Sequence, residues 1–330
     1  MRERRFSATI VYGAVVLVLL AAVVSVVVSC GRRQPARMPP APTTSVLRDT
    51  VRVRGVERKV SPDVQSVTTD VSAAVAVVCG DDPATADRYE ARNDALRSIA
   101  RRRDLARNDV ALLMAYVGAT NDALRAERVA ALKNDVLNLL RNQNPVPDGL
   151  AELLIGILSA DEDEVPYPPA VLDYCIQHLG ALQGDIKEKA LRGRVRAVLV
   201  RAARRVSFPY AGAALYSLSE DRRGTAAHDA ELKRLTLALC APSANAAARI
   251  AAIQLAGQRG WREVLPILRK TLAGARRDAV VDMAAIGSIG LLGREEDLPL
   301  LESMRVKGGL RLRPAVDAAV RRIKERGGGK

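Results

Sequence analysis

From Ser61 onwards, apolar residues recur at spacings of three and four, and Pro, Gly, Asn or Asp interrupts them at short intervals. This spacing is typical of amphipathic helices that bury one face. The interruptions indicate short turns between successive helices. The pattern predicts helices over 61–79, 89–103, 109–119, 123–142, 148–159, 168–183, 185–206, 209–219 and 226–240.

Two stretches near the C-terminus match position for position at an offset of 33 residues. The first is ARIAAIQLAGQRGWREVLPIL, 248–268, and the second is VDMAAIGSIGLLGREEDLPLL, 281–301. Both contain paired alanines, two glycines three residues apart and a Leu-Pro pair. A third, altered copy begins at Leu312 and has Arg321 and Lys324 in place of the two glycines. Repetition at this period indicates a solenoid of stacked helical units.

These copies resemble HEAT repeats of the short bacterial, phycobilisome-lyase-like type. The resemblance implies one helical hairpin per repeat, stacked into a right-handed α-solenoid. It covers 246–326, where Trp261 and Arg294 stand at positions at which the family usually has a helix-capping Asp. We therefore expect an all-α protein, an α-solenoid with HEAT-like repeats over 243–330 and divergent helical repeats over 81–242.

The N-terminal segment carries three arginines and is then uncharged from Phe6 to Cys30, long enough to cross a hydrocarbon core of about 30 Å. The residues Val27–Gly31 resemble a bacterial lipobox, which implies cleavage before Cys30 and lipidation of its sulfur. The alternative interpretation is an uncleaved anchor helix. Residues 1–29 are thus predicted as a signal peptide or membrane anchor. Both interpretations place the rest of the chain outside the cytoplasm, in a bacterial cell envelope and facing the periplasm or the exterior.

A linker and a helix follow this segment. Residues 30–60 are rich in Pro and small polar residues and lack helical periodicity, so we expect a flexible linker. Residues 61–80 form a predicted amphipathic helix, for which Gly80 is the stop signal.

Charge is distributed unevenly along the chain, whose net charge is +14. Residues 81–165 carry 11 basic and 16 acidic groups, whereas 166–330 carry 29 basic and 16 acidic groups. A basic second half suits anionic lipid or an envelope polymer, although a solvated surface without a ligand is the simpler interpretation. Because stacking aromatic residues do not accompany the basic ones, a nucleic-acid partner is not expected.

Residues suited to catalysis are sparse. The chain has two histidines, and His178 follows Cys175 by three residues on an apolar helix, a spacing common in packing. Cys79, Cys175 and Cys240 form no CxxC pair, and their disulfide state is left open. No phosphate loop, nucleophile elbow or zinc motif is present. We therefore expect no catalytic, cofactor-binding or metal-binding residues, and a protein that is not an enzyme.

Two features are candidate contact sites. Arg249, Asp282 and Arg313 occupy the same position of successive repeats, so their alternating charges predict an inter-repeat ladder. Trp261 is the only tryptophan and lies at a repeat turn, which makes it a candidate partner contact.

These observations predict a membrane-tethered, extracytoplasmic scaffold or interaction protein that binds another macromolecule, most simply a protein. One alternative is a peripheral module whose basic second half docks on anionic lipid or an envelope polymer. Another is a lyase-like or enzyme-accessory protein, which requires a pocket lined by Tyr174, Cys175 or His178.

Overall fold

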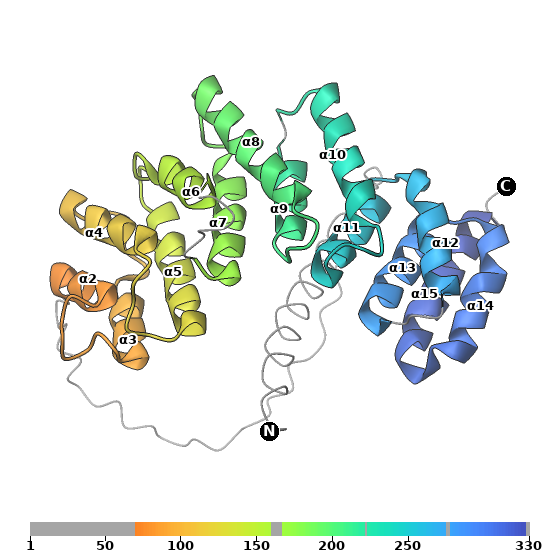
Figure 1. Cartoon of the computed structure of the whole chain (residues 1–330), viewed down its shortest axis with the longest axis horizontal. Helices are drawn as coiled ribbons and strands as arrows, with labels where there is room; N and C mark the ends of the chain where they lie inside the picture. Colours follow the sequence, from red (N-terminus) through yellow and green to blue (C-terminus); the bar gives the residue numbers. More distant parts are fainter. Residues whose placement is uncertain (1–69, 160–166, 222, 275–277, 328–330) are drawn as a thin grey trace, which may run out of the picture. The chain divides into compact units, whose positions relative to one another are not determined.

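The computed structural model describes residues 70–159, 167–221, 223–274 and 278–327 (Figure 1). The chain divides into two units, Met1–Val64 and Gln65–Lys330, and every described residue belongs to the second. These residues form fourteen α-helices, two short 3-10 helices and no strand, which confirms the expected all-helical protein.

The α-helices are α2 (Val71–Cys79), α3 (Tyr89–Ile99), α4 (Arg107–Gly118), α5 (Ala126–Arg141), α6 (Leu150–Ser159), α7 (Pro169–Leu182), α8 (Lys189–Arg204), α9 (Ala211–Ser219), α10 (Ala226–Leu239), α11 (Ala246–Gln258), α12 (Leu265–Ala273), α13 (Ala279–Leu292), α14 (Leu298–Lys307) and α15 (Gly309–Gly327). The 3-10 helices η2 (Arg262–Val264) and η3 (Glu295–Asp297) precede α12 and α14.

The helices pair into hairpins that stack on one another. Each even-numbered helix packs against the odd-numbered helix that follows it, from α2 with α3 to α14 with α15. The odd-numbered helices also pack in order, each against the next, from α3 to α15. This gives an odd layer and an even layer, the arrangement of a helical solenoid in which each unit contacts its neighbours.

Local sequence explains where several helices begin and end. The Thr225 side chain accepts a hydrogen bond from the His228 amide at the start of α10, and Asn245 caps α11 in the same way. The Asp278 carboxylate accepts hydrogen bonds from two amides at the start of α13. Gly80 ends α2 with φ of 81°, a left-handed conformation that favours glycine. Capping satisfies amides that have no partner within the helix.

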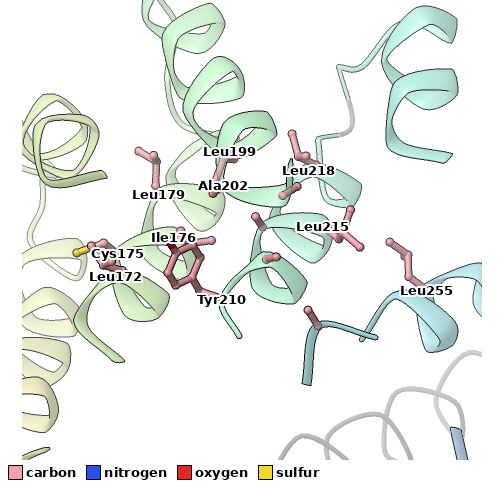
Figure 2. Close-up of a cluster of buried hydrophobic side chains, with 14 of the residues drawn as sticks. Leu172, Cys175, Ile176, Leu179, Leu199, Ala202, Tyr210, Leu215, Leu218 and Leu255 are labelled. Atoms are coloured by element: carbon pink, nitrogen blue, oxygen red, sulfur yellow. The ribbon is translucent and has the colours of Figure 1, made fainter. Parts of the chain in front are cut away.

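The core lies between the two layers and consists of leucine, valine, isoleucine and alanine side chains. Figure 2 shows part of it, where side chains of α7, α8 and α9 are directed into one cluster that includes Leu179, Leu199 and Leu215. A single hairpin has too few apolar side chains to form such a core. The stacking of neighbours is therefore required for stability.

Small residues set the close approach of helices in the odd layer. A Cβ built on Gly257 of α11 would lie 2.6 Å from the Ser288 hydroxyl of α13, and one on Gly290 would lie 2.8 Å from the Ala319 backbone of α15. In addition, the Ser288 hydroxyl donates a hydrogen bond of 2.9 Å to the Ile253 carbonyl. Gly257 and Gly290 are the first of the two glycines in each sequence copy, so the repeat motif acts at the helix interface.

The same contact occurs in the middle of the chain, where the sequence motif is absent. Gly180 of α7 faces Ser217 of α9, with a Cβ distance of 2.3 Å to the hydroxyl, and Ser217 donates to the Ile176 carbonyl at 3.2 Å. In both pairs the accepting carbonyl lies four residues before the glycine. The helices α7 and α9 therefore stack by the same interaction as α11 and α13.

The last described helix, α15, has one buried and one exposed side. Leu312, Val316, Ala319 and Ile323 bury one side of α15 against its neighbours, whereas Arg321 and Lys324 are exposed. The charged residues that replace the two glycines in the third copy are therefore solvated.

Several predictions concern residues 1–69, which lie outside the described residues. They are the membrane segment over 1–29, Cys30, the linker over 30–60 and the start of the amphipathic helix, which the structure describes as α2 from its cap Asp70. Among the described residues, none of the helices has the length and apolar character needed to span a membrane.

Candidate functional site

One side of α13 is exposed although the helix lies within the stack. Gly290 contacts α15, and Ser288 contacts α11. The side away from the core carries Val280, Met283, Gly287 and Leu291, at helical spacings of three and four. Val280 is 42% exposed and Leu291 is 43% exposed, so apolar side chains meet solvent here.

The corresponding sides of α11 and α9 continue this surface. Ile250 and Gln254 are half-buried on α11, as are Ala213 and Tyr216 on α9. The Tyr216 hydroxyl donates a hydrogen bond of 3.4 Å to Gln254 Oε1, which links the two helices. We call this surface the α9–α13 face, and its eight residues, none of them charged, are Ala213, Tyr216, Ile250, Gln254, Val280, Met283, Gly287 and Leu291.

Two carboxylates lie beyond the α9 end of this surface, Asp173 on α7, which packs against α9, and Asp135 on α5, which packs against α7. Burial raises the pKa of Asp173 to about 6, against the effect of a hydrogen bond from Gln177. Burial also raises the pKa of Asp135. The pKa of Tyr174 is raised by burial and by the charges of both carboxylates. The hydroxyl therefore lies close enough to Asp173 and Asp135 to be affected by their ionisation. Both carboxylates would be stabilised by a cation.

This arrangement has the chemistry of a protein-binding surface. The eight uncharged, partly apolar side chains on three adjacent helices provide area that a partner can desolvate at low cost. The carboxylates at the α5–α7 end offer attraction for a basic group. An amphipathic polypeptide segment, apolar along its length and basic at one end, complements both parts.

Cys175 and His178 are buried packing residues. Cys175 is fully buried, and burial raises its pKa to about 12, so the thiolate that a nucleophile requires is not formed (Figure 2). His178 Nε2 is hydrogen-bonded to Asn134 Oδ1 at 3.1 Å, and burial lowers the pKa of His178 to about 4. A small hollow among α6, α7 and α8 is lined by neither residue, nor by Tyr174. The proposed pocket at these residues is therefore not formed in the described structure.

The cysteines in the described part of the chain are free. Cys79 is half-buried, whereas Cys175 and Cys240 are buried, and none of the three forms a disulfide there. No group of three or more His, Cys, Asp or Glu side chains suited to a metal ion occurs among the described residues.

A buried ion pair that the sequence did not suggest lies at the N-terminal end of the stack. Arg92, 1% exposed, donates hydrogen bonds of 2.8 and 3.0 Å to the Asp122 carboxylate and one of 2.9 Å to the Val78 carbonyl. Lys133 is also buried and donates to the Val117 carbonyl at 3.0 Å. Since these cations are bonded to a carboxylate and to backbone carbonyls, the cluster fixes the turns between α2 and α5.

Trp261 lies at the turn between α11 and η2, as expected, and is half-buried. Its amide donates to the Ala256 carbonyl at 3.0 Å, and its side chain packs against the core. Part of the ring system is therefore available to a partner. No observation tests that contact, which stays a prediction.

The three residues of the predicted ladder have different surroundings. Arg249 donates to the Cys240 carbonyl at 3.1 Å and to the Thr271 hydroxyl at 2.5 Å. Asp282 is buried at the start of α13, and Arg313 is exposed on α15. The ladder through these residues also stays a prediction.

Ion pairs between neighbouring repeats do occur at residues that the sequence did not single out. Arg196 of α8 contacts Glu231 of α10 at 3.1 Å, and Lys233 of α10 contacts Glu263 of η2 at 2.6 Å. A third pair joins α12 to η3, and its members are Arg269 and Asp297, 2.7 Å apart. These pairs lie on the even side of the stack, where helix-to-helix packing is less extensive than in the odd layer.

Comparisons with known proteins give no family for the chain. No family model matches it, and no curated protein does. Among solved structures, it is similar to human deoxyhypusine hydroxylase in complex with glycerol, with 14% sequence identity and a TM-score of 0.32. That similarity covers 77% of this chain and 96% of the hydroxylase chain.

The comparison corrects one expectation from the sequence, that the chain is not an enzyme. The similar solved structure is that of an enzyme. Physically, a helical stack can present catalytic groups anywhere on its surface, so the lack of a familiar motif in one sequence does not exclude catalysis. We withdraw the expectation, and a similarity at this level assigns no reaction to the chain.

Proposed function

We propose that this protein is a HEAT-like binding protein that holds a segment of another protein on its α9–α13 face. The observation that carries the proposal is the exposed, uncharged side shared by three adjacent helices, with Leu291 and Val280 at its α13 edge. The repeat period of 33 residues and the stacked hairpins support the HEAT-like type of unit.

The proposed partner segment is amphipathic and basic at one end. Its apolar side chains lie along α9, α11 and α13. Its basic end lies near Asp135 and Asp173, whose pKa values are both raised by burial. A cation from the partner would restore the solvation energy that burial removes from these carboxylates.

The proposal includes a location in a bacterial cell envelope. Three arginines followed by an uncharged run up to Cys30 support a segment that delivers the chain to a membrane. Labelling with a palmitate analogue distinguishes the two forms of attachment. A lipoprotein loses the label in Cys30→Ala, whereas an uncleaved anchor keeps its full mass and is not labelled in the wild type.

Site-specific crosslinking tests the binding surface. A photo-crosslinking amino acid at Met283 in the full chain, on membranes of the native host, is expected to give one discrete protein adduct. A crosslinker at Leu112, 43% exposed on α4 of the even layer, is the matched control and is expected to give none. Mass spectrometry of the adduct then identifies the partner segment, which is synthesised as a peptide.

The synthetic peptide makes the test decisive. Ile250→Asp and Leu291→Asp place a charge in the uncharged surface and are expected to weaken peptide binding by more than about tenfold, as for a contact at the centre of an interface. Asp173→Asn is expected to weaken binding only for a peptide with its basic end intact. Equal binding by the wild type and both Asp variants would exclude the α9–α13 face as the binding surface.

A further inference from the structure

The two most exposed large apolar side chains of the described structure lie four residues apart in the chain. Val306 is 83% exposed and Leu310 is 78% exposed, whereas the other exposed large apolar residues reach at most 43%. Val306 lies in the last turn of α14, and Leu310 lies in the first turn of α15. Two such side chains in water are unfavourable unless another surface covers them.

The turn between these residues is built to hold them outward. Gly309 has φ of 63°, in the left-handed region that favours glycine. A Cβ on Gly308 would lie 2.8 Å from the Met304 carbonyl oxygen, so the end of α14 requires glycine there as well. Leu312 is buried inside the stack, while Leu310, two residues earlier, lies outside it. The exposure is thus a consequence of a defined turn.

Four cations lie within three residues of Val306 or Leu310 in the chain. Lys307, Arg311 and Arg313 are exposed and form no ion pair within the described residues. The nearby Arg305 is paired with Glu302 at 3.4 Å and with Asp317 at 2.7 Å, so the two local carboxylates already have a partner. The turn consequently has an excess of positive charge close to its apolar side chains.

We propose that the α14–α15 turn is a lipid-docking tip, which inserts Val306 and Leu310 into the headgroup region of an anionic membrane. Lys307, Arg311 and Arg313 then contact the lipid phosphates. Of the possible occupants, an anionic bilayer matches both features together, because it offers apolar depth beneath a negative surface. This proposal is independent of the α9–α13 face, which lacks charged residues.

A tryptophan probe tests insertion directly. In the full chain with Trp261→Phe, Leu310→Trp provides a single fluorophore at the tip. The chain is reconstituted through its own N-terminal segment into phosphatidylcholine vesicles with or without about 30 mol% phosphatidylglycerol. In the anionic vesicles we expect a blue-shifted emission that brominated lipid quenches. In the neutral vesicles we expect a spectrum close to that in water.

Two matched controls make the result specific to the tip. Leu291→Trp in the same Trp261→Phe chain, on the α9–α13 face, is expected to remain unquenched in both vesicles. All variants carry the same first 69 residues, and flotation with the vesicles checks that equal amounts of each variant are attached. Quenching at Leu310→Trp no greater than at Leu291→Trp would overturn the proposal, and would leave protein binding as the explanation for the exposed turn.

The charge requirement is tested by two triple variants. Lys307→Gln, Arg311→Gln and Arg313→Gln together are expected to reduce the docking equilibrium constant by on the order of a hundredfold, since each cation near an anionic surface contributes about fivefold. Lys187→Gln, Lys189→Gln and Arg194→Gln on and next to α8 remove the same charge elsewhere. An equal loss in both triple variants would show an effect of net charge alone and would also overturn the proposal.

Discussion

The Ser288 hydroxyl of α13 sits against Gly257 of α11 and donates its hydrogen bond to the α11 backbone. The acceptor is the Ile253 carbonyl, 2.9 Å away. Any side chain at position 257 would occupy the space that the hydroxyl fills, since an added Cβ lies 2.6 Å from it. The pair therefore combines a close helix contact with a satisfied buried hydroxyl.

Gly257→Ala is expected to destabilise the protein by about 1–3 kcal/mol, because the added methyl forces α11 and α13 apart. Gly287→Ala is the matched control, since no atom lies within 4 Å of a Cβ there and the site is inside the same α13. The control is expected to stabilise by about 0.5–1 kcal/mol, the usual gain from alanine within a helix. Urea denaturation followed by circular dichroism measures both, and equal effects would contradict the close contact.

Asp122→Asn is expected to destabilise the N-terminal hairpins by about 3–5 kcal/mol, because it leaves the Arg92 guanidinium buried without its counter-charge. The exposed pair of Arg97 and Asp94, 3.6 Å apart with both side chains 74% exposed, provides the control. Asp94→Asn is expected to cost less than about 1 kcal/mol. Hydrogen exchange of α2 to α5 amides reports the difference locally, and similar protection in both variants would argue against a role for the buried pair.

Asp297 is expected to contribute more to stability than its neighbour Glu296, although both contact Arg269. Burial by itself raises the pKa of Asp297, but hydrogen bonds from Arg269 and from the Arg294 amide outweigh it and hold this pKa below its usual value. The Asp297 carboxylate therefore stabilises the fold at pH values above its unfolded pKa. This stabilisation is lost as the pH falls through the folded pKa. Below about pH 4, Asp297→Asn should reduce the decrease in unfolding free energy that accompanies falling pH, whereas Glu296→Gln should not. Urea midpoints across this range check both.

His178 is expected to make the protein less stable in mild acid. Its folded pKa of about 4 is below the unfolded value of about 6.5, so the unfolded chain binds the proton first as pH falls. The contribution of His178 to stability should decrease from about pH 6.5 to about pH 4, by up to about 3 kcal/mol. Because the contribution of Asp173 changes in the opposite direction over part of this window, the quantity to compare is the difference in urea midpoint between the wild type and His178→Gln. A difference that is constant over this window would contradict the prediction.

Asp173→Asn is expected to raise stability at neutral pH, because burial raises the carboxyl pKa to about 6 and disfavours the charged form in the folded state. The sign is opposite to that of His178: the contribution of Asp173 falls as pH rises from about 3.8 to about 6. Thermal melts at pH 7 and at pH 3.5 check this, since the advantage of the variant should disappear at the lower pH. An advantage of equal size at both values would point to a cause other than ionisation.

Local patterns in the sequence predicted most helices closely. The helix expected over 168–183 is α7, Pro169–Leu182, and the helix expected over 226–240 is α10, Ala226–Leu239. Apolar spacing and turn residues act within a few positions, so they can be recognised in a single sequence. The helix expected over 185–206 is shorter, since α8 begins at Lys189.

Interactions between distant residues could not be predicted in this way. Arg92 and Asp122 are 30 residues apart, and each resembles an ordinary surface charge in its own segment. A second example is the capping residue near Arg294, which stands where HEAT repeats of this type usually have a capping Asp. The Asp297 carboxylate, three residues later, accepts a hydrogen bond of 3.0 Å from the Arg294 amide. The Gly180 contact was also missed, because one glycine in an apolar helix does not indicate what packs on it.

The two layers of the stack join their helices through different kinds of contact, and this gives them different mechanical properties. Between odd helices, Gly257, Ser288 and their equivalents touch at the backbone, and a small displacement breaks the fit. Between even helices, long side chains such as Lys233 and Glu263 can follow a displacement by rotating about several bonds. Bending of the stack is therefore absorbed on the even side, and the α9–α13 face keeps a fixed spacing for whatever binds there.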